Sequence, residues 1–149
     1  GGFALAQGFS ESGLTRWLAE QLTVLQGFNS ILIILAVVLL VVFLTEVTSN
    51  TATASLLLPV MGALATAIDM NPLGLMVAAV VAASFAFMLP VATPPNAIVF
   101  SSRYISIAQM AAAGLRLNLV GVLVISGFVY LLLPYAWGIQ LQGAVAVIR

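Results

Sequence analysis

The chain has 149 residues, of which 63% are hydrophobic and 5% are charged, and its formal net charge is zero. Soluble domains contain about 25% charged residues, so this composition indicates an integral membrane protein. The sequence has no Cys and no His, which excludes structural zinc sites, catalytic thiols, disulfides and imidazole bases. Its few basic residues are arginines that form no cluster, so no nucleic-acid partner is expected.

The N-terminal segment, residues 1–29, is more polar than the rest of the chain. Its start, Gly1–Ala4, has neither an initiator Met nor a positively charged region, so it does not resemble a signal peptide and suggests the interior of a longer chain. Between residues 10 and 25, Trp17 and several leucines recur at helical spacing. This pattern predicts an amphipathic helix that lies at the membrane interface or connects two spans.

Segment 30–69 contains a polar tract between two apolar arms. The arms are Ile31–Leu44 and Leu56–Ile68, and the tract is Thr45–Ser55. The stretch Asp69–Pro72 after the second arm predicts a turn. As one helix, residues 30–68 would be about 58 Å long, whereas the hydrocarbon core is about 30 Å thick. Each arm is shorter than the roughly 18 residues that a full span needs. We therefore expect a re-entrant helical hairpin with its Ser-Asn-Thr tip near mid-membrane.

A second apolar segment, 72–104, contains three prolines between residues 90 and 95. They remove three amide donors, so a helix must break there. In lipid a broken backbone survives only where protein or a water-filled cavity satisfies it. We expect a discontinuous transmembrane helix, interrupted at Thr93-Pro94-Pro95-Asn96. Before this interruption, small residues that permit close helix contact recur at helical spacing: Ala78, Ala82 and Ala86.

The remaining segments are predicted as a connection (105–116), a last transmembrane helix (117–139) and a tail (140–149). Aromatic residues near the end of the last helix are typical of a membrane interface, and Pro134 is expected to end or kink it. If the hairpin returns to its starting side, the interrupted helix carries Arg103 and Arg116 across the membrane. The positive-inside tendency then places them in the cytoplasm as interfacial anchors and the C-terminus outside.

Two interrupted helices in a membrane create sites for ions. A helix exposes carbonyls at its C-terminal end, which attract a cation, and amides at its N-terminal end, which attract an anion. The oxygens available to a sodium ion are the carbonyls of Thr45, Thr48 and Ala92 and the side chain of Asn50. The donors available to a carboxylate are the side chains of Ser49, Asn50, Thr51 and Thr93. Discontinuous helices of this kind mark the substrate and ion sites of secondary transporters. As the alternative, these polar residues only pack helices together.

Glu46 is the one ionisable residue of the predicted membrane core. An intramembrane carboxylate is a candidate proton or cation site. It can also brace the hairpin against backbone amides in a part of the protein outside this chain. We favour the brace, because the neighbouring residues of the tract include no cation.

The tracts Ser49–Ala54 and Ala92–Ala97 resemble the second-repeat signatures of the divalent anion/sodium symporter family, and Gly1–Ala6 with Ser12-Gly13-Leu14 is also similar to that family. The resemblance implies two inverted repeats, each with a hairpin tip, an unwound helix and a sodium site, and a substrate site between them. It also implies sodium as the co-transported ion, no organic cofactor, a homodimer with elevator-type movement, and a bacterial inner membrane. This chain contains only one such repeat, so an N-terminal repeat outside it would be needed.

By the same resemblance, site residues can be assigned. The sodium site, mainly of backbone carbonyls, comprises Thr45, Thr48, Asn50, Ala92 and Pro94. The substrate site comprises Ser49, Asn50, Thr51, Thr93 and Pro94.

We therefore expect an all-α integral membrane protein that forms the C-terminal part of a sodium-coupled symporter for di- or tricarboxylates, with succinate or malate as the first candidates. Alternatives of the same architecture are a proton-coupled carrier, in which Glu46 titrates, and a carrier of sulfate, citrate or arsenite. The alternative of another class is a non-transporting scaffold subunit, in which substitution of Asn50 changes stability but not ligand binding. An enzyme is not expected, because no nucleophile–base pair or metal-ligand cluster is visible.

Overall fold

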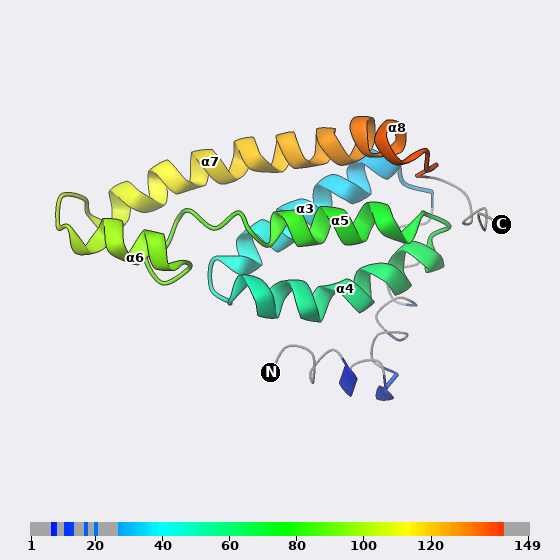
Figure 1. Ribbon diagram of the computed structural model, residues 1–149, viewed down its shortest axis with the longest axis horizontal. Helices are drawn as coiled ribbons and strands as arrows, with labels where there is room; N and C mark the ends of the chain where they lie inside the picture. The colour runs from blue at the N-terminus through cyan, green and yellow to red at the C-terminus, as the bar shows by residue number, and fades with distance from the viewer. Residues whose placement is uncertain (1–6, 9–10, 14–16, 18–19, 21–26, 142–149) are drawn as a thin grey trace.

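The computed structural model describes residues 7–8, 11–13, 17, 20 and 27–141. Most of the helix predicted for 10–25 and most of the tail therefore lie outside the described residues. The elements in the described part are all helices (Figure 1). Two helical runs are long and apolar enough to cross a membrane by length and composition, namely Asn50–Ala67 and Ile107–Trp137.

Segment 30–69 folds into two helices, α3 (Ser30–Thr45) and α4 (Asn50–Ala67). Helix α4 begins at Asn50 because the side chain of Ser49 accepts a hydrogen bond from the amide of Ala52 and so caps the helix. The chain reverses between the two helices, and α4 runs back along the bundle (Figure 1).

The prediction that each arm is too short for a full span is wrong for α4. This helix has 18 residues, because it starts inside the polar tract rather than at Leu56. Helix α3 has 16 residues and remains shorter than a typical span. The re-entrant path of the hairpin through a bilayer stays a prediction.

A tight turn joins α4 to α5 (Pro72–Ala82), within the predicted stretch Asp69–Pro72. Asp69 adopts a left-handed conformation with a φ of 56°. The side chain of Asn71 caps α5 by accepting from the amide of Leu73, and Pro72 occupies the first turn, where no amide donor is needed.

The interruption of the second apolar segment begins earlier than predicted. Helix α5 ends at Ala82, residues 83–93 are not helical, and α6 spans Pro94–Ser101. The predicted break at Thr93–Asn96 is wrong in position, because Pro94 and Pro95 lie in the first turn of α6 and Thr93 caps it. Proline is favoured at such a position, since the amide of a first-turn residue has no helical partner.

The last helix also begins earlier than predicted. Helix α7 (Ile107–Gly127) continues through a π-helical turn, η2 (Phe128–Leu132), into α8 (Leu133–Trp137). Most of the predicted connection 105–116 is therefore helical. The start of α7 has a recognisable sequence motif, because Ser106 and Gln109 form a reciprocal capping box.

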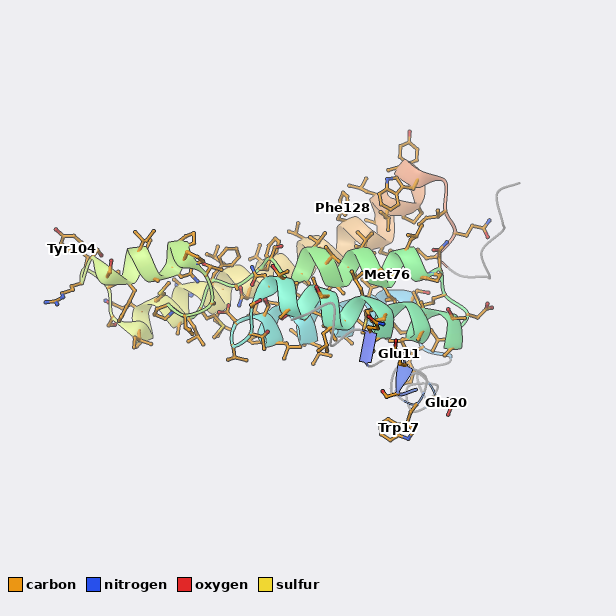
Figure 2. The ribbon with its side chains drawn as sticks, turned by 60° about the horizontal axis from the view of Figure 1, so that its bottom comes forward. Glu11, Trp17, Glu20, Met76, Tyr104 and Phe128 are labelled. Carbon is orange, nitrogen blue, oxygen red and sulfur yellow. The ribbon has the colours of Figure 1, made fainter. Side chains whose placement is uncertain are left out.

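Pro134 does not end this helix, and the π-helical turn explains why. A proline has no amide hydrogen, and its ring clashes with the carbonyl four residues earlier in an α-helix. In the wider turn before it, the amide of Leu133 donates to the carbonyl of Phe128, five residues earlier. The helix bends beyond Phe128 (Figure 2) and stops at Gly138, which has a φ of 63°.

Helix α5 packs against α3, α4 and α7. Its buried face consists mainly of small residues: Gly74, Leu75, Ala78, Ala79 and Ala82. Helix α3 buries paired aliphatic residues at helical spacing: Ile33, Ile34, Val37, Val38, Val41 and Val42. The opposite face of α3 is exposed yet also apolar, with Leu32, Leu39 and Leu40. A helix that is apolar on all sides is typical of a membrane environment.

Helix α7 contacts the non-helical segment closely at two glycines. A Cβ atom placed on Gly114 would overlap the carbonyl oxygen of Phe87, and one on Gly121 would overlap the Phe85 ring. Gly114, Asn118 and Gly121 are all buried and share one face of the helix. The two glycines therefore let the non-helical segment lie directly on α7.

Gly114→Ala is expected to lower the free energy of unfolding by about 1–3 kcal/mol, because the new methyl group would overlap backbone atoms of Phe87 and Met88. Gly127→Ala is the matched control in the same helix, since nothing lies within 4 Å of its new Cβ. The control should be neutral or slightly stabilising. Thermal unfolding of the complete purified protein measures both. Equal melting temperatures for the two variants would contradict the close contact.

Candidate functional site

The two helix interruptions lie toward the same end of the bundle (Figure 1), and Glu46 joins them. Its carboxylate accepts hydrogen bonds from the backbone amides of Phe87 at 2.7 Å, Met88 at 2.9 Å and Leu89 at 3.1 Å. Helix α7 contributes a fourth donor, Nδ2 of Asn118, at 2.7 Å. Glu46 is only 3% exposed, so this contact lies inside the protein.

The donors around Glu46 favour the brace over the alternative of a proton or cation site. An ionised carboxylate only accepts hydrogen bonds, and all four of these partners are donors. Hydrogen bonds to charged groups are worth about 1.5–3 kcal/mol each. Consecutive backbone amides that converge on one anion are known from anion-binding nests. The partners lie within this chain, so the prediction that they lie outside it is wrong.

The same contact explains why α5 ends before the prolines. In a continuous helix, the amides of residues 87–89 would donate to carbonyls four residues earlier. Here they donate to Glu46 instead, so the helix cannot extend through them. The non-helical path of residues 87–89 is therefore stabilised by a carboxylate 41 to 43 residues earlier in the chain.

Thr45 is the buried polar centre of the α3–α4 turn. Its hydroxyl oxygen lies 2.8 Å from Oδ1 of Asn50 and 2.8 Å from the carbonyl oxygen of Ala83. The hydroxyl has one proton for these two acceptors. Three oxygens thus gather at the C-terminal end of α3, where the helix dipole adds partial negative charge. A corner with this charge and these oxygens suits a cation.

The structure brings only part of the predicted sodium site together by direct hydrogen bonds. Thr45 and Asn50 are bonded to each other. Thr48 braces the turn, because its hydroxyl donates to the carbonyl of Leu44 and contacts the hydroxyl of Thr53. Ala92 lies in the non-helical segment and Pro94 begins α6, and no direct hydrogen bond joins either of them to these hairpin residues in the described part of the chain. The link between the two groups runs through Glu46.

Two residues of the predicted substrate site are helix caps. The hydroxyl of Ser49 accepts from the amide of Ala52 at 3.0 Å, and that of Thr93 accepts from the amide of Asn96 at 3.4 Å. Each hydroxyl keeps its own proton and can still donate to an anion. Both also stand at helix N-termini, where partial positive charge favours anions. Of the other predicted substrate residues, Asn50 accepts a hydrogen bond from Thr45, and Thr51 and Pro94 are exposed in the first turns of α4 and α6.

Asn96 and Asn118 are functional candidates that the sequence analysis did not assign to a site. Nδ2 of Asn96 donates to the carbonyls of Ala86 at 2.9 Å and Leu89 at 3.0 Å. Glu46 accepts from the amides of residues 87–89, and Asn96 donates to the carbonyls of Ala86 and Leu89. Backbone donors and backbone acceptors of the non-helical segment therefore both have side-chain partners. Asn118 had a sequence signal, since it is an amide in an apolar helix with glycines four residues before and three residues after it.

The described residues contain no group of three or more His, Cys, Asp or Glu side chains that could hold a metal ion. A cation would therefore be held mainly by neutral oxygens. A cavity of about 460 Å³ lies between α6 and α7 and is lined by Asn96, Gln109 and mostly apolar neighbours. None of the predicted sodium or substrate residues lines it, so it is not the candidate site.

Asn96→Asp is expected to destabilise the non-helical segment more than Asn96→Ala does. The aspartate would place a carboxylate oxygen against two carbonyl oxygens that now accept from Nδ2, whereas alanine only removes the donor. Asn29→Asp is the control, because the side chain of Asn29 accepts from the amide of Ile31 and an aspartate can do the same. Melting temperatures of the complete protein provide the comparison. If Asn96→Asp lowers the melting temperature less than Asn96→Ala does, then Nδ2 of Asn96 does not face the two carbonyls.

Comparison with known proteins shows the family. Residues 1–142 match the family model described as "Sodium:sulfate symporter transmembrane region". The sodium-dependent dicarboxylate transporter SdcS of Staphylococcus saprophyticus is 51% identical over 140 residues, which are 94% of this chain and 27% of the relative. The SdcS of Staphylococcus aureus (strain MRSA252) is 52% identical over 142 residues, or 95% of this chain and 27% of the relative.

The chain thus spans about a quarter of the length of the curated relatives it matches. The family model covers nearly the whole chain, and the curated relatives are named as transporters rather than enzymes. The chain therefore belongs to the sodium:sulfate symporter family, that is, to the divalent anion/sodium symporters, which are integral membrane transporters.

Proposed function

We propose that this chain is the C-terminal part of a sodium-coupled symporter for dicarboxylates, with C4-dicarboxylates such as succinate or malate as substrates. The observation that carries the proposal is the pair of interrupted helices whose ends Glu46 ties together. The identity of 51% and 52% to sodium-dependent dicarboxylate transporters supports the choice of ion and substrate. An N-terminal repeat outside this chain would complete the site.

The proposed sodium site lies where α3 ends. The oxygens that gather around the Thr45 hydroxyl support it, as does the negative charge of the adjacent Glu46. In this site the sodium ion is bound mainly by backbone carbonyls of the predicted residues: Thr45, Thr48, Asn50, Ala92 and Pro94. Neutral ligands let the ion leave again, which a co-transported ion requires.

The proposed substrate site lies where α4 and α6 begin. The capping hydroxyls of Ser49 and Thr93 point to it, because each has a proton left to donate. The contributing residues are Ser49, Asn50, Thr51, Thr93 and Pro94. One carboxylate of the substrate would contact these groups, and the N-terminal repeat would contact the other.

Asn50 provides the coupling between the two sites. Its Oδ1 faces Thr45, on the sodium side, and its amide group is available to the substrate. Sodium binding would fix this side chain, order the hairpin tip and offset the negative charge of the substrate. Coupling then equals the difference in substrate affinity between the sodium-bound and sodium-free states.

We further propose a multi-pass protein of the bacterial inner membrane that acts as a homodimer with elevator-type movement. The connection between α6 and α7 forms one end of the molecule, where Tyr104 projects (Figure 2). Tyr104 is 91% exposed and follows Arg103. An aromatic and a basic residue together are typical of the membrane interface, and the positive-inside tendency favours the cytoplasmic side. The C-terminus is then extracytoplasmic.

Asn50→Ala is expected to reduce sodium-dependent succinate uptake into proteoliposomes about tenfold or more, because it removes groups from both sites. Thr66→Ala is the matched control at the far end of α4, since its exposed hydroxyl bonds only within that helix. The complete protein with and without each substitution is compared at equal amounts. Uptake that needs no sodium would overturn the coupling, and uptake of sulfate but not succinate would overturn the substrate class. A protein that moves no anion and loses only stability with Asn50→Ala would indicate a scaffold.

A further inference from the structure

Thr45 and Glu46 hold the non-helical segment next to the hairpin at two places, Ala83 and residues 87–89. The Thr45 hydroxyl contacts the Ala83 carbonyl at the start of this segment. Glu46 binds the three consecutive amides of residues 87–89. Among the described residues, these bonds are the direct polar links between the hairpin and the non-helical segment.

Few hydrogen bonds separate Glu46 from the proposed ligands Ala92 and Thr93. Glu46 binds the amide of Leu89. The carbonyl of Leu89 in turn accepts from the amide of Ala92 at 3.2 Å and from Nδ2 of Asn96 at 3.0 Å. Ala92 and the residue after it, Thr93, are proposed ligands of sodium and substrate. A shift of the Glu46 carboxylate therefore reaches the proposed ligands through a single residue.

Asn118 adds a side-chain donor to this carboxylate. It is fully buried on α7 between the two glycines that contact the segment. Its Nδ2 donates to Oε1 of Glu46, while its Oδ1 has no hydrogen-bond partner. The hydrogen-bond partner of the Asn118 side chain is therefore Glu46. Through this hydrogen bond, α7 is joined to the carboxylate that binds residues 87–89.

We infer that Glu46 is a positioning residue for sodium binding, which sets where Ala92 and Thr93 lie relative to the hairpin tip. A glutamine cannot replace it, because one acceptor oxygen becomes an NH₂ group that faces donors. An aspartate keeps the charge but is one methylene shorter, so it can satisfy only part of the arrangement. The role in sodium binding rests on the proposed function, whereas the hold on residues 87–89 is independent of it.

Hydrogen–deuterium exchange of the complete protein tests that hold without any transport assay. Glu46→Gln is expected to speed exchange of a peptide covering residues 85–89 by about tenfold or more, because their amides lose a charged acceptor. Asp69→Asn is the matched control: it also removes one negative charge, from an exposed turn, and asparagine tolerates its positive φ. Unchanged exchange in Glu46→Gln would overturn the inference, whatever the protein transports.

Sodium-dependent uptake then separates positioning from a merely structural role. For Glu46→Gln, we expect the sodium concentration at half-maximal uptake to rise about tenfold, and Glu46→Asp should fall between this variant and the unaltered protein. A structural role alone would lower the amount of folded protein and the maximal rate but leave that sodium concentration unchanged, and this result would overturn the inference. If the complete protein moves no anion, the proposed function fails, while the exchange experiment still decides whether Glu46 holds the segment.

Asn118 supplies a second route if Glu46→Gln does not fold. Asn118→Ala leaves the carboxylate and its backbone partners in place and removes one donor, so we expect a smaller increase in the same sodium concentration. Asn118→Asp places a second carboxylate against Oε1 of Glu46 and should have the larger effect. A larger effect of alanine than of aspartate would contradict the inferred arrangement.

Discussion

Three backbone amides and one side-chain amide donate to the carboxylate of Glu46, and the rest of the architecture depends on this contact. A buried amide without a partner is unfavourable by roughly 1–3 kcal/mol on protein mutational scales. After α5 ends, the chain can stay non-helical inside the bundle because Glu46 accepts from the amides of residues 87–89. The segment released in this way is what allows α6 to start anew, with its own N-terminus, beside the hairpin tip.

Such a segment also needs room, and small residues provide it. Ala78, Ala82 and Ala86 are buried where α5 and its continuation pack, and Gly114 and Gly121 let residues 85–88 lie directly on α7. Helix ends supply partial charges of both signs from the backbone alone. The carbonyl end of α3 is partly negative, and the amide ends of α4 and α6 are partly positive. The carboxylate of Glu46 contributes its charge and also fixes the position of the non-helical segment.

Features with a local cause could be predicted from the sequence, and features with a distant cause could not. The polar tract between α3 and α4 and the Asp69–Pro72 turn rest on caps, prolines and composition within a few residues. The non-helical path of residues 87–89 depends on Glu46, more than forty residues earlier in the chain, and the prolines mark only the end of the interruption. Asn118 lies 72 residues from Glu46, so no local sequence pattern could predict the hydrogen bond between them. The start of α7 was missed although its Ser106–Gln109 capping box was readable.

The continuous helix from Ile107 to Trp137 has a consequence for its depth in the bilayer. Its 31 residues correspond to about 46 Å, roughly 16 Å more than the hydrocarbon core. Ordinary tilts of about 20° absorb only a few ångströms of this mismatch. The stretch from Ile107 to Arg116 measures about 14 Å by the same rise per residue and accounts for most of the excess. We therefore expect the water–lipid boundary near Arg116 at one end and near Tyr135 and Trp137 at the other, with the first turns of α7 outside the acyl chains on the side of the headgroups and water.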